Sequence, residues 1–316
     1  MSKVINLKNK PKTWSLREFN DRKNEILFYR SLGGLGDILM HRMVFEDFKK
    51  INPETKIYFA CPPKYHDALI DHPYLDGVLD YQKISITDYL MWFNTSACCG
   101  RYETATAPYC DKHRSDIWAE FSGVKLTSHE MHIRMTEEEL QFGRDAIKKV
   151  RNKEGPSIVI CPISAMSSKN LTIQMLKDIA NEPLLKDYFL FGLHAVPIEA
   201  NIPTIHGVST REWMSILSSV DYVISVDTAA FHFAGGIKKP LTGIFSWADG
   251  KIYGKYYPSA SIVQLHRDNY KELPCCPCYN YGSCPLTKEP VKPCLTNITH
   301  SMIMEQVNKM LINYPM

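Results

Sequence analysis

Residues 25–50 of the chain read EILFYRSLGGLGDILMHRMVFEDFKK. The apolar run at residues 25–30 predicts a buried strand, because it is short and is bounded by turn residues. The stretch after residue 36 predicts an amphipathic helix, since apolar residues recur on one of its faces, namely Met40, Met43, Val44 and Phe48. A strand that feeds a helix through a tight turn is typical of α/β layers built around a parallel sheet.

The turn between this strand and helix contains Gly33, Gly34, Gly36 and Asp37. Glycine permits a positive φ and a close approach of a ligand to the backbone, and the start of the helix presents free N–H groups. The pattern is neither the G-x-G-x-x-G dinucleotide fingerprint nor a P-loop, since no Gly-Lys-Ser/Thr follows. Asp37 therefore has two interpretations: a residue that caps the helix, or the base of an active site.

The length and composition of the chain indicate two globular domains. The 316 residues are 45% hydrophobic and 22% charged, and the formal net charge is +3. A polar run at residues 151–156, RNKEGP, separates two halves that each begin with a strand. We therefore predict a basic extension over residues 1–24, an N-terminal domain over 25–153 and a C-terminal domain over 154–316.

Hydrophobic periodicity predicts alternating strands and helices in both halves. Strands are expected at residues 25–30, 56–62, 77–81, 157–162, 187–193, 204–208, 222–227 and 241–246. Helices with a capping box are expected after Thr136, with Glu139, and after Ser209, with Glu212, and further helices after Thr172 and over residues 228–237. Residues 87–124, rich in aromatic residues and cysteines, are expected to form loops and short helices that face a substrate.

A second candidate site is the segment SVDTAAFHFAGGIKKP at residues 225–240. A buried strand ends at Asp227, and the amides from Thr228 onward begin a helix that can hold phosphate oxygens. His232 follows at a spacing that places it on the same side of this helix. The alternative is that Asp227 caps the helix and that His232 is a half-buried histidine with ordinary partners.

A third candidate is Lys169, in the stretch ISAMSSKNLTIQMLKDIA at residues 163–180. It stands in a loop of small and hydroxylated residues between a buried strand and a helix. A positive charge at this place would neutralise a diphosphate. The alternative is a surface lysine near a helix start.

These three motifs, in this order, resemble glycosyltransferase family 9, the bacterial heptosyltransferases. The resemblance extends from about Glu25 to Ile312 and rests on the turn Gly34-Leu35-Gly36-Asp37, on Lys169, and on the segment from Asp227 to His232, followed by Pro240 and Phe245. It implies an α/β chain with the GT-B fold, in which two Rossmann-like, doubly wound domains face each other across a cleft.

The resemblance also implies an activity. The protein would move a sugar, with inversion, from a nucleotide diphosphate sugar such as ADP-heptose to an acceptor hydroxyl, a lipopolysaccharide-type glycan by family default. Asp37 would be the general base, and Gly33, Gly34 and Gly36 would form the loop on the acceptor side. Donor binding would fall to Lys169, Asp227, Thr228, Ala229 and His232. Since we find no Asp-x-Asp motif for a divalent metal, no catalytic cofactor is expected.

The chain has ten cysteines, and four of them follow the pattern C-x2-C-x5-C-x9-C in a loop over residues 275–294, namely Cys275, Cys278, Cys284 and Cys294. Four thiolates suit a structural zinc or a single iron ion and leave no open position for catalysis. The alternative is a loop packed with reduced cysteines, among them Cys276. A similar set of cysteines occurs in several family 9 members, and some relatives bind a metal through it.

No apolar signal segment or long apolar run is found, so a cytoplasmic protein is expected, with a peripheral place at the inner membrane face as a further option. Two other functions stay open. A transferase acting on modified DNA bases or on protein side chains would differ in its acceptor, and the basic residues between Lys3 and Lys23 are the only hint of a nucleic-acid partner. A non-catalytic protein that binds nucleotide sugars would keep Lys169 but have no need of Asp37.

Overall fold

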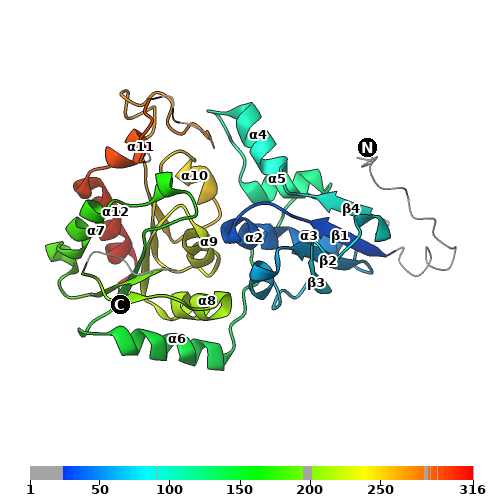
Figure 1. Cartoon of the computed structure of the whole chain (residues 1–316), viewed down its shortest axis with the longest axis horizontal. Coiled ribbons are helices and arrows are strands. Elements are labelled where there is room, and N and C mark those ends of the chain that lie inside the picture. Colours follow the sequence, from blue (N-terminus) through cyan, green and yellow to red (C-terminus); the bar gives the residue numbers. More distant parts are fainter. Residues whose placement is uncertain are drawn as a thin grey trace.

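The computed structural model describes residues 24–89, 91–194, 201–280, 284, 286–289 and 291–315. The described residues form two parallel β-sheets, each with helices packed against it, and the two layered units lie side by side (Figure 1). The predicted basic extension lies outside the described residues, apart from Asn24.

The first sheet has the strand order β3-β2-β1-β4, with all pairs parallel. Its strands are β1 (Glu25–Tyr29), β2 (Lys56–Cys61), β3 (Gly77–Asp80) and β4 (Met91–Asn94). The helices that follow β1 are α2 (Leu35–His41) and α3 (Phe45–Ile51), joined by a 3-10 turn, and those that follow β4 are α4 (Cys98–Thr106) and α5 (Arg114–Phe121). The helix face predicted from Met40, Met43, Val44 and Phe48 is buried in the core.

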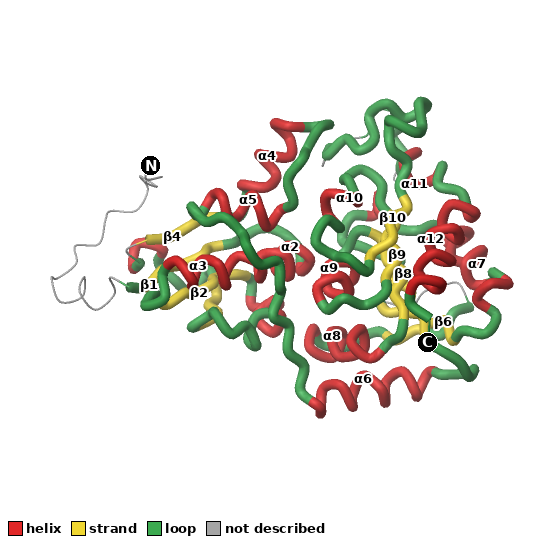
Figure 2. Tube along the Cα trace, turned by 180° about the vertical axis from the view of Figure 1, so that it is seen from behind, coloured by secondary structure: helices red, strands yellow, loops and turns green. Residues whose placement is uncertain are grey.

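The second sheet has the order β10-β9-β8-β5-β6-β7 and is also entirely parallel. Its strands are β5 (Ser157–Cys161), β6 (Phe189–Leu193), β7 (Thr204–Ile205), β8 (Tyr222–Val226), β9 (Leu241–Ile244) and β10 (Ala260–Val263). Its helices are α6 (Glu137–Val150), α7 (Ile173–Ala180), α8 (Thr210–Ser219), α9 (Ala229–Gly236), α10 (Gly250–Tyr253), α11 (Pro293–Thr296) and α12 (His300–Asn313). Figure 2 shows this sheet edge-on, with helices on both of its faces.

Both sheets are wound in the same way. In each, the first strand of the unit lies beside the fourth, so the strand order reverses between β1 and β4 in one sheet and between β5 and β8 in the other. Ligands of doubly wound folds bind at this reversal, outside the carboxyl ends of the strands. Asp37 lies after β1, Lys169 after β5 and Asp227 after β8. All three predicted site residues therefore lie in connections that follow strands next to a reversal point.

The predicted helix starts are confirmed at both capping boxes, Thr136 with Glu139 and Ser209 with Glu212. Helix α6 packs along α8, although it precedes the polar run at residues 151–156. The predicted linker thus separates the strands of the first sheet from those of the second. The chain itself passes to the second layered unit earlier, before α6.

The stretch at residues 87–124 departs in one respect from the prediction of loops and short helices. It contains the strand β4, whose two end residues are exposed and whose middle residues are half-buried. Such an edge strand shows no clean alternation and no continuous apolar run, so its period is invisible in the sequence. The loops and the short helices α4 and α5 are present as expected.

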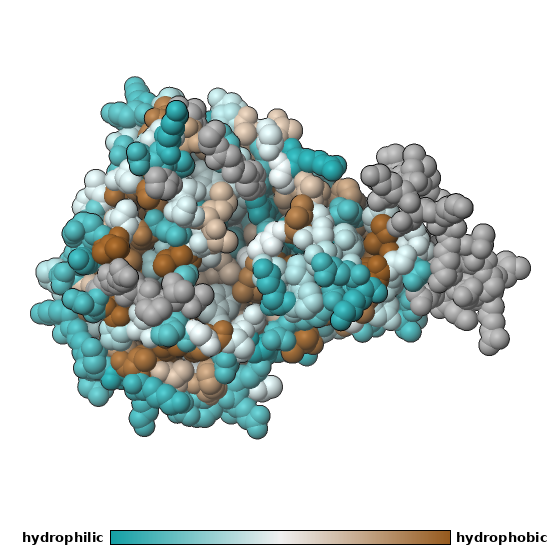
Figure 3. All heavy atoms as spheres, viewed as in Figure 1, coloured by the Kyte–Doolittle hydropathy of each residue, from teal (hydrophilic) through white to brown (hydrophobic). Residues whose placement is uncertain are grey.

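On the face shown in Figure 3, the described apolar side chains lie in small separate groups among hydrophilic ones. Within the described ranges, no helix is both long and apolar enough to pass through a membrane.

Candidate active site

The first turns of α2 and α9 meet where the two layered units face each other, and both views show these helices as neighbours (Figures 1 and 2). A Cβ atom added to Gly36 would lie 2.9 Å from Cδ2 of His232 and 3.5 Å from the Cα of Ala229. The structure therefore brings the glycine turn of the first unit against the Asp-Thr-x-x-x-His segment of the second. A larger residue at position 36 would push these helix starts apart.

Asp37 lies in the first turn of α2 and is 8% exposed. Its Oδ2 accepts a hydrogen bond of 2.9 Å from the Gly34 amide and lies 3.2 Å from Nη2 of Arg30. Its Oδ1 accepts from Nη1 of Arg114 at 2.5 Å. The two interpretations of Asp37 are thus not exclusive, because one carboxylate oxygen caps the helix start while the other faces a different side chain.

The charge state of Asp37 follows from these partners. Burial would raise the pKa of this carboxyl, but the guanidinium groups of Arg114 and Arg30 and the Gly34 amide outweigh burial and hold the pKa well below its usual range. Asp37 is therefore a carboxylate throughout the neutral and mildly acidic range.

The glycine turn leaves room for this arrangement. Gly33 has a φ of 109°, which a residue with a side chain adopts only with strain, and a Cβ there would collide with the Arg30 guanidinium and with Oδ2 of Asp37. Gly34 is the N-cap of α2 in an extended conformation. The absence of a side chain at Gly33 thus leaves space for the Asp37 carboxylate and Arg30, whereas a Cβ at Gly34 would meet nothing within 4 Å.

Arg114 and its partners are functional candidates that the sequence analysis did not find. Nε and Nη2 of Arg114 bind the two carboxylate oxygens of Glu103 at 2.7 and 2.8 Å, and its guanidinium lies 5.1 Å from the ring centre of Tyr253. The hydroxyl of Tyr253 donates to Oε1 of Glu103 at 2.9 Å. Glu103 and Arg114 come from α4 and α5, whereas Tyr253 ends α10 of the other unit.

On the second unit, Lys169 and Asp227 form an ion pair, with 2.7 Å between Nζ and Oδ2. Nε2 of His232 lies 3.8 Å from Oδ1 of Asp227, and Nδ1 of His232 lies 3.1 Å from the hydroxyl of Tyr257. The ammonium of Lys169 also lies 4.9 Å from the ring centre of Trp247. The structure therefore brings Lys169, Asp227 and His232 together.

The electrostatics of this group are set by burial and by the lysine. Burial would raise the pKa of Asp227, but the Lys169 ammonium and the His232 ring hold it well below its usual range. Burial lowers the pKa of His232 despite the nearby Asp227 carboxylate, so the imidazole is neutral at pH 7. Helix α9 begins after Thr228, whose side chain does not cap it, so its first amides can receive an anion.

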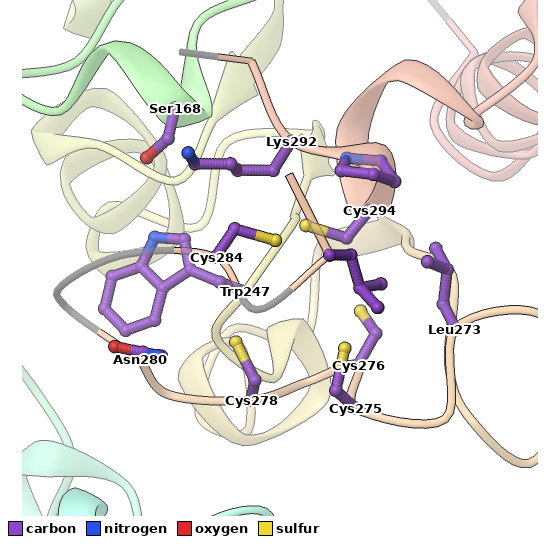
Figure 4. Close-up of a pocket in the computed structure, with 12 residues that line it drawn as sticks. Ser168, Trp247, Leu273, Cys275, Cys276, Cys278, Asn280, Cys284, Lys292 and Cys294 are labelled. Atoms are coloured by element: carbon purple, nitrogen blue, oxygen red, sulfur yellow. The ribbon is translucent and has the colours of Figure 1, made fainter. Parts of the chain in front are cut away.

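The cysteine loop lies beside this group. Cys275, Cys276, Cys278, Cys284 and Cys294 line one pocket together with Ser168 and Trp247, and Figure 4 shows thiols from both ends of the loop around it. Even so, within the ranges that the structure describes, no three Cys, His, Asp or Glu residues lie close enough together to hold a metal ion. The thiols share a cavity but do not form a ligand shell for zinc or iron in this arrangement.

The residues missed by the sequence analysis differ in the signal they carried. Arg30 stands directly after a buried strand, where a charged residue is unusual, and this position could have marked it. Glu103 and Arg114 lie in the stretch without clear period, and Tyr253 lies in a short helix of four residues. Nothing in their spacing indicates that these three side chains meet.

No protein-family model matches the chain, and no curated protein matches it in sequence. Among solved structures it is similar to a family 9 glycosyltransferase from Veillonella parvula, with a TM-score of 0.66 and 14% identity over 92% of this chain and 97% of that one. It is also similar to the ADP-heptose LPS heptosyltransferase II of Escherichia coli, with a TM-score of 0.59 and 11% identity over 92% and 99% of the two chains.

A third similar structure is that of the iron-containing dodecameric glycosyltransferase TibC from enterotoxigenic E. coli, with a TM-score of 0.65 and 14% identity over 92% of this chain and 76% of that one. These likenesses establish the fold. The chain has the two-domain GT-B architecture of the family 9 glycosyltransferases, and the fold predicted from its motifs is confirmed.

Proposed function

We propose that the protein is an inverting glycosyltransferase that moves a sugar from a nucleotide diphosphate sugar to an acceptor hydroxyl. The observation that carries this proposal is the contact between α2 and α9. It brings the helix that carries the ionised Asp37 carboxylate against an uncapped helix start on the other unit, where Lys169 pairs with Asp227. Glycosyl transfer needs charge at these two places, on the acceptor hydroxyl and on the leaving diphosphate.

On the donor side, Lys169 and the first amides of α9, from Thr228 to Ala229, are proposed to hold the diphosphate. The ammonium carries three donors, and its pairing with Asp227 fixes its position between β5 and β8. Asp227 and His232 are proposed to shape the pocket without contacting the leaving oxygen. Because a lysine and oriented amides supply the positive charge, the proposed mechanism needs no catalytic metal.

On the acceptor side, Asp37 is proposed to take the proton of the attacking hydroxyl, and the turn formed by Gly33, Gly34 and Gly36 to let the acceptor approach. Among the described residues, Oδ1 accepts a hydrogen bond only from Arg114, so one of its lone pairs is available. A positioned carboxylate of this kind assists attack on an oxocarbenium-like centre, and the displacement inverts the configuration.

The similar structures support a choice of donor and acceptor. One is described as an ADP-heptose heptosyltransferase, and another was solved with ADP-D-β-D-heptose. We therefore propose an ADP-heptose-like donor and a lipopolysaccharide-type glycan as the acceptor, modified on the cytoplasmic side of the inner membrane.

The test is a comparison of donor binding with transfer. Purified protein is screened by thermal shift against ADP-, GDP-, UDP-, CDP- and dTDP-sugars, since a ligand that binds only the folded state raises the melting temperature. The donor that binds is then used in a transfer assay with wild type, Asp37→Asn and the exposed control Asp145→Asn. The proposal requires that Asp37→Asn keeps donor binding and loses transfer. Equal turnover in all three proteins would favour a different base, and binding without transfer in wild type would favour a sequestering protein.

A structural zinc or iron ion on Cys275, Cys278, Cys284 and Cys294 is a separate part of the proposal. It is supported by the common pocket and by the iron-containing neighbour, and it requires the thiols to draw closer than they lie here. Metal analysis of the purified chain and of a Cys278→Ser/Cys284→Ser variant tests it. One equivalent of metal in wild type and none in the variant is the expected result, and metal-free wild type contradicts it.

A further inference from the structure

The hydrogen bond between Tyr253 and Glu103 joins the two layered units at a buried place. The Tyr253 side chain belongs to α10, is 2% exposed, and donates to Oε1 of Glu103 at 2.9 Å. The Glu103 side chain belongs to α4 and is fully buried. A buried carboxylate needs partners for its oxygens, so this bond is worth more here than it would be on the surface.

Glu103 in turn holds the side chain that holds Asp37. Both oxygens of Glu103 are bound by Arg114 in the two-pronged geometry that guanidinium and carboxylate groups prefer. The remaining prong of Arg114, Nη1, donates to Oδ1 of Asp37 at 2.5 Å. The Arg114 guanidinium is therefore fixed in its plane by Glu103 and in its position by the ring of Tyr253 against it.

We infer that Arg114 is a positioning residue for Asp37. Tyr253, acting through Glu103, then makes the position of Arg114 depend on how the donor unit, the layered unit of the second sheet that carries the proposed donor site, docks against the first. This inference rests on the proposed function, because it gives Asp37 the role of base. It goes further in stating that the acceptor side of the site is complete only when the α10 end of the other unit is seated against α4 and α5.

Tyr253 also connects Glu103 and Arg114 to the proposed donor site, which contains His232. The ring of Tyr253 lies 6.0 Å from that of His232, which contacts the helix start carrying Gly36. A displacement of the donor unit would thus withdraw the Tyr253 hydroxyl from Glu103 and also part α2 from α9. Catalysis depends on such positioning, since a displacement of about 1 Å in a reacting group can cost a hundredfold in rate.

The decisive variant is Tyr253→Phe, because it removes the hydroxyl and keeps the ring against Arg114. The chain offers a matched control in Tyr256→Phe. The Tyr256 hydroxyl also crosses between the units, donating at 2.8 Å to the carboxylate of Asp116 on α5. Among the described residues, no side-chain hydrogen bond or ion pair joins Tyr256 or Asp116 to Asp37. Both substitutions remove a hydrogen bond from a tyrosine to a carboxylate of the other unit, and the bond of Tyr256 is the less buried of the two.

We expect Tyr253→Phe to lower kcat about tenfold, as the loss of one buried hydrogen bond allows, while KM for the donor changes less than about twofold. The control should stay within about twofold of wild type in both constants. Equal losses of kcat in the two variants would overturn the inference, because they would show a general effect of loosening the interface.

A second readout does not depend on transfer. The carboxyl carbon of Asp37, labelled with ¹³C, reports its protonation by NMR. The charged and titratable groups that face it are Arg30, Arg114, His41 and His232, with Glu103 behind Arg114. Asp37 should remain ionised from pH 7 to about pH 4 in wild type and in Tyr256→Phe. In Arg114→Gln the Asp37 signal should begin to titrate at a higher pH than in wild type, because one of the two guanidinium groups that oppose the effect of burial is gone.

The two readouts separate the inference from the function on which it rests. If wild type transfers no sugar from any donor, the proposed function fails, and the NMR titration still decides whether Arg114 controls Asp37. An Asp37 signal that is the same in wild type and in Arg114→Gln overturns the inference even if the transferase is active.

Discussion

A Cβ atom added to Gly36 would lie 2.9 Å from Cδ2 of His232, so the contact between these two residues sets how closely α2 approaches α9. Real Cβ atoms rarely come that close to another carbon. The contact joins the turn that carries Asp37 to the helix start that is proposed to receive the donor diphosphate. The distance between the two halves of the proposed site is therefore fixed by the absence of a side chain at position 36.

Gly36→Ala should consequently impair transfer more than it impairs folding. The added methyl forces His232 or the whole of α2 to move, and we expect kcat/KM to fall at least about tenfold while stability drops by about 1–3 kcal/mol. The matched control is Gly100→Ala on α4, where nothing lies within 4 Å of the added Cβ. Steady-state kinetics and thermal melts on both variants check the prediction, and unchanged kinetics in Gly36→Ala would contradict it.

Lys169→Met should abolish donor binding. The substitution keeps most of the length of the side chain and removes the charge proposed to hold the diphosphate, so the thermal shift caused by the donor should disappear. The exposed Lys177→Met on α7 serves as the control and should keep the shift. In wild type the shift should be the same with and without EDTA. A shift that persists in Lys169→Met would remove this lysine from the donor site.

This variant also leaves the buried Asp227 without its ion-pair partner, which raises the pKa of that carboxyl and destabilises the fold by about 3–5 kcal/mol. The double variant Lys169→Met/Asp227→Asn separates the two effects. It should regain most of the melting temperature and should still fail to bind the donor. Recovery of binding in the double variant would show that the lysine serves the fold rather than the ligand.

Arg42→Met should be among the most destabilising substitutions in the first unit. The Arg42 side chain is fully buried, pairs with Asp71 and donates to the carbonyl oxygens of Met131, Ala68 and His132. Its loss leaves these buried oxygens without a donor, and we expect a cost of about 3 kcal/mol or more. Urea titration of this variant and of Arg144→Met, on the exposed side of α6, measures the difference. A cost below about 1 kcal/mol would contradict the prediction.

The parts of the fold that the sequence predicts are those dominated by local periodicity. All five residues of β5 and of β8 are buried, so these strands appear in the sequence as nearly continuous apolar runs. The helices after Thr136 and Ser209 are predicted by their capping boxes. The edge strand β4 has no such signature, because its residues are half-buried or exposed. β4 is a strand because its backbone pairs with that of β1, and the hydrophobic pattern of its own residues does not predict this pairing.

The candidate site divides in a similar way. Asp227 directly follows β8, and Asp37 and Lys169 lie in the connections that follow β1 and β5, so strand ends and glycine spacing are enough to single them out. The link from Tyr253 through Glu103 to Arg114 depends on how two separately wound units pack together. A sequence read without its relatives carries no record of that packing, and each of the three side chains alone resembles an ordinary surface or core residue.

His41 should make the protein less stable in mild acid. Its ring is fully buried among aromatic side chains, and neither ring nitrogen has a hydrogen-bond partner in the described part of the chain. Burial, together with the nearby Arg30 charge, holds the pKa of His41 well below 6.5. Below about pH 6.5, His41 therefore binds a proton in the unfolded chain but not in the folded chain. The free energy of unfolding falls as the pH drops.

His41→Phe should remove this contribution, because phenylalanine fills the aromatic site without a titrating group. Between pH 7.5 and pH 5, wild type should lose about 2 kcal/mol more than the variant, since each pH unit below 6.5 is worth about 1.4 kcal/mol for one proton. Urea titrations at the two pH values measure this difference, and His206→Phe at an exposed position is the control. Parallel losses in wild type and His41→Phe would mean that other buried histidines, such as His72 with its pKa lowered to about 2, carry the acid sensitivity instead.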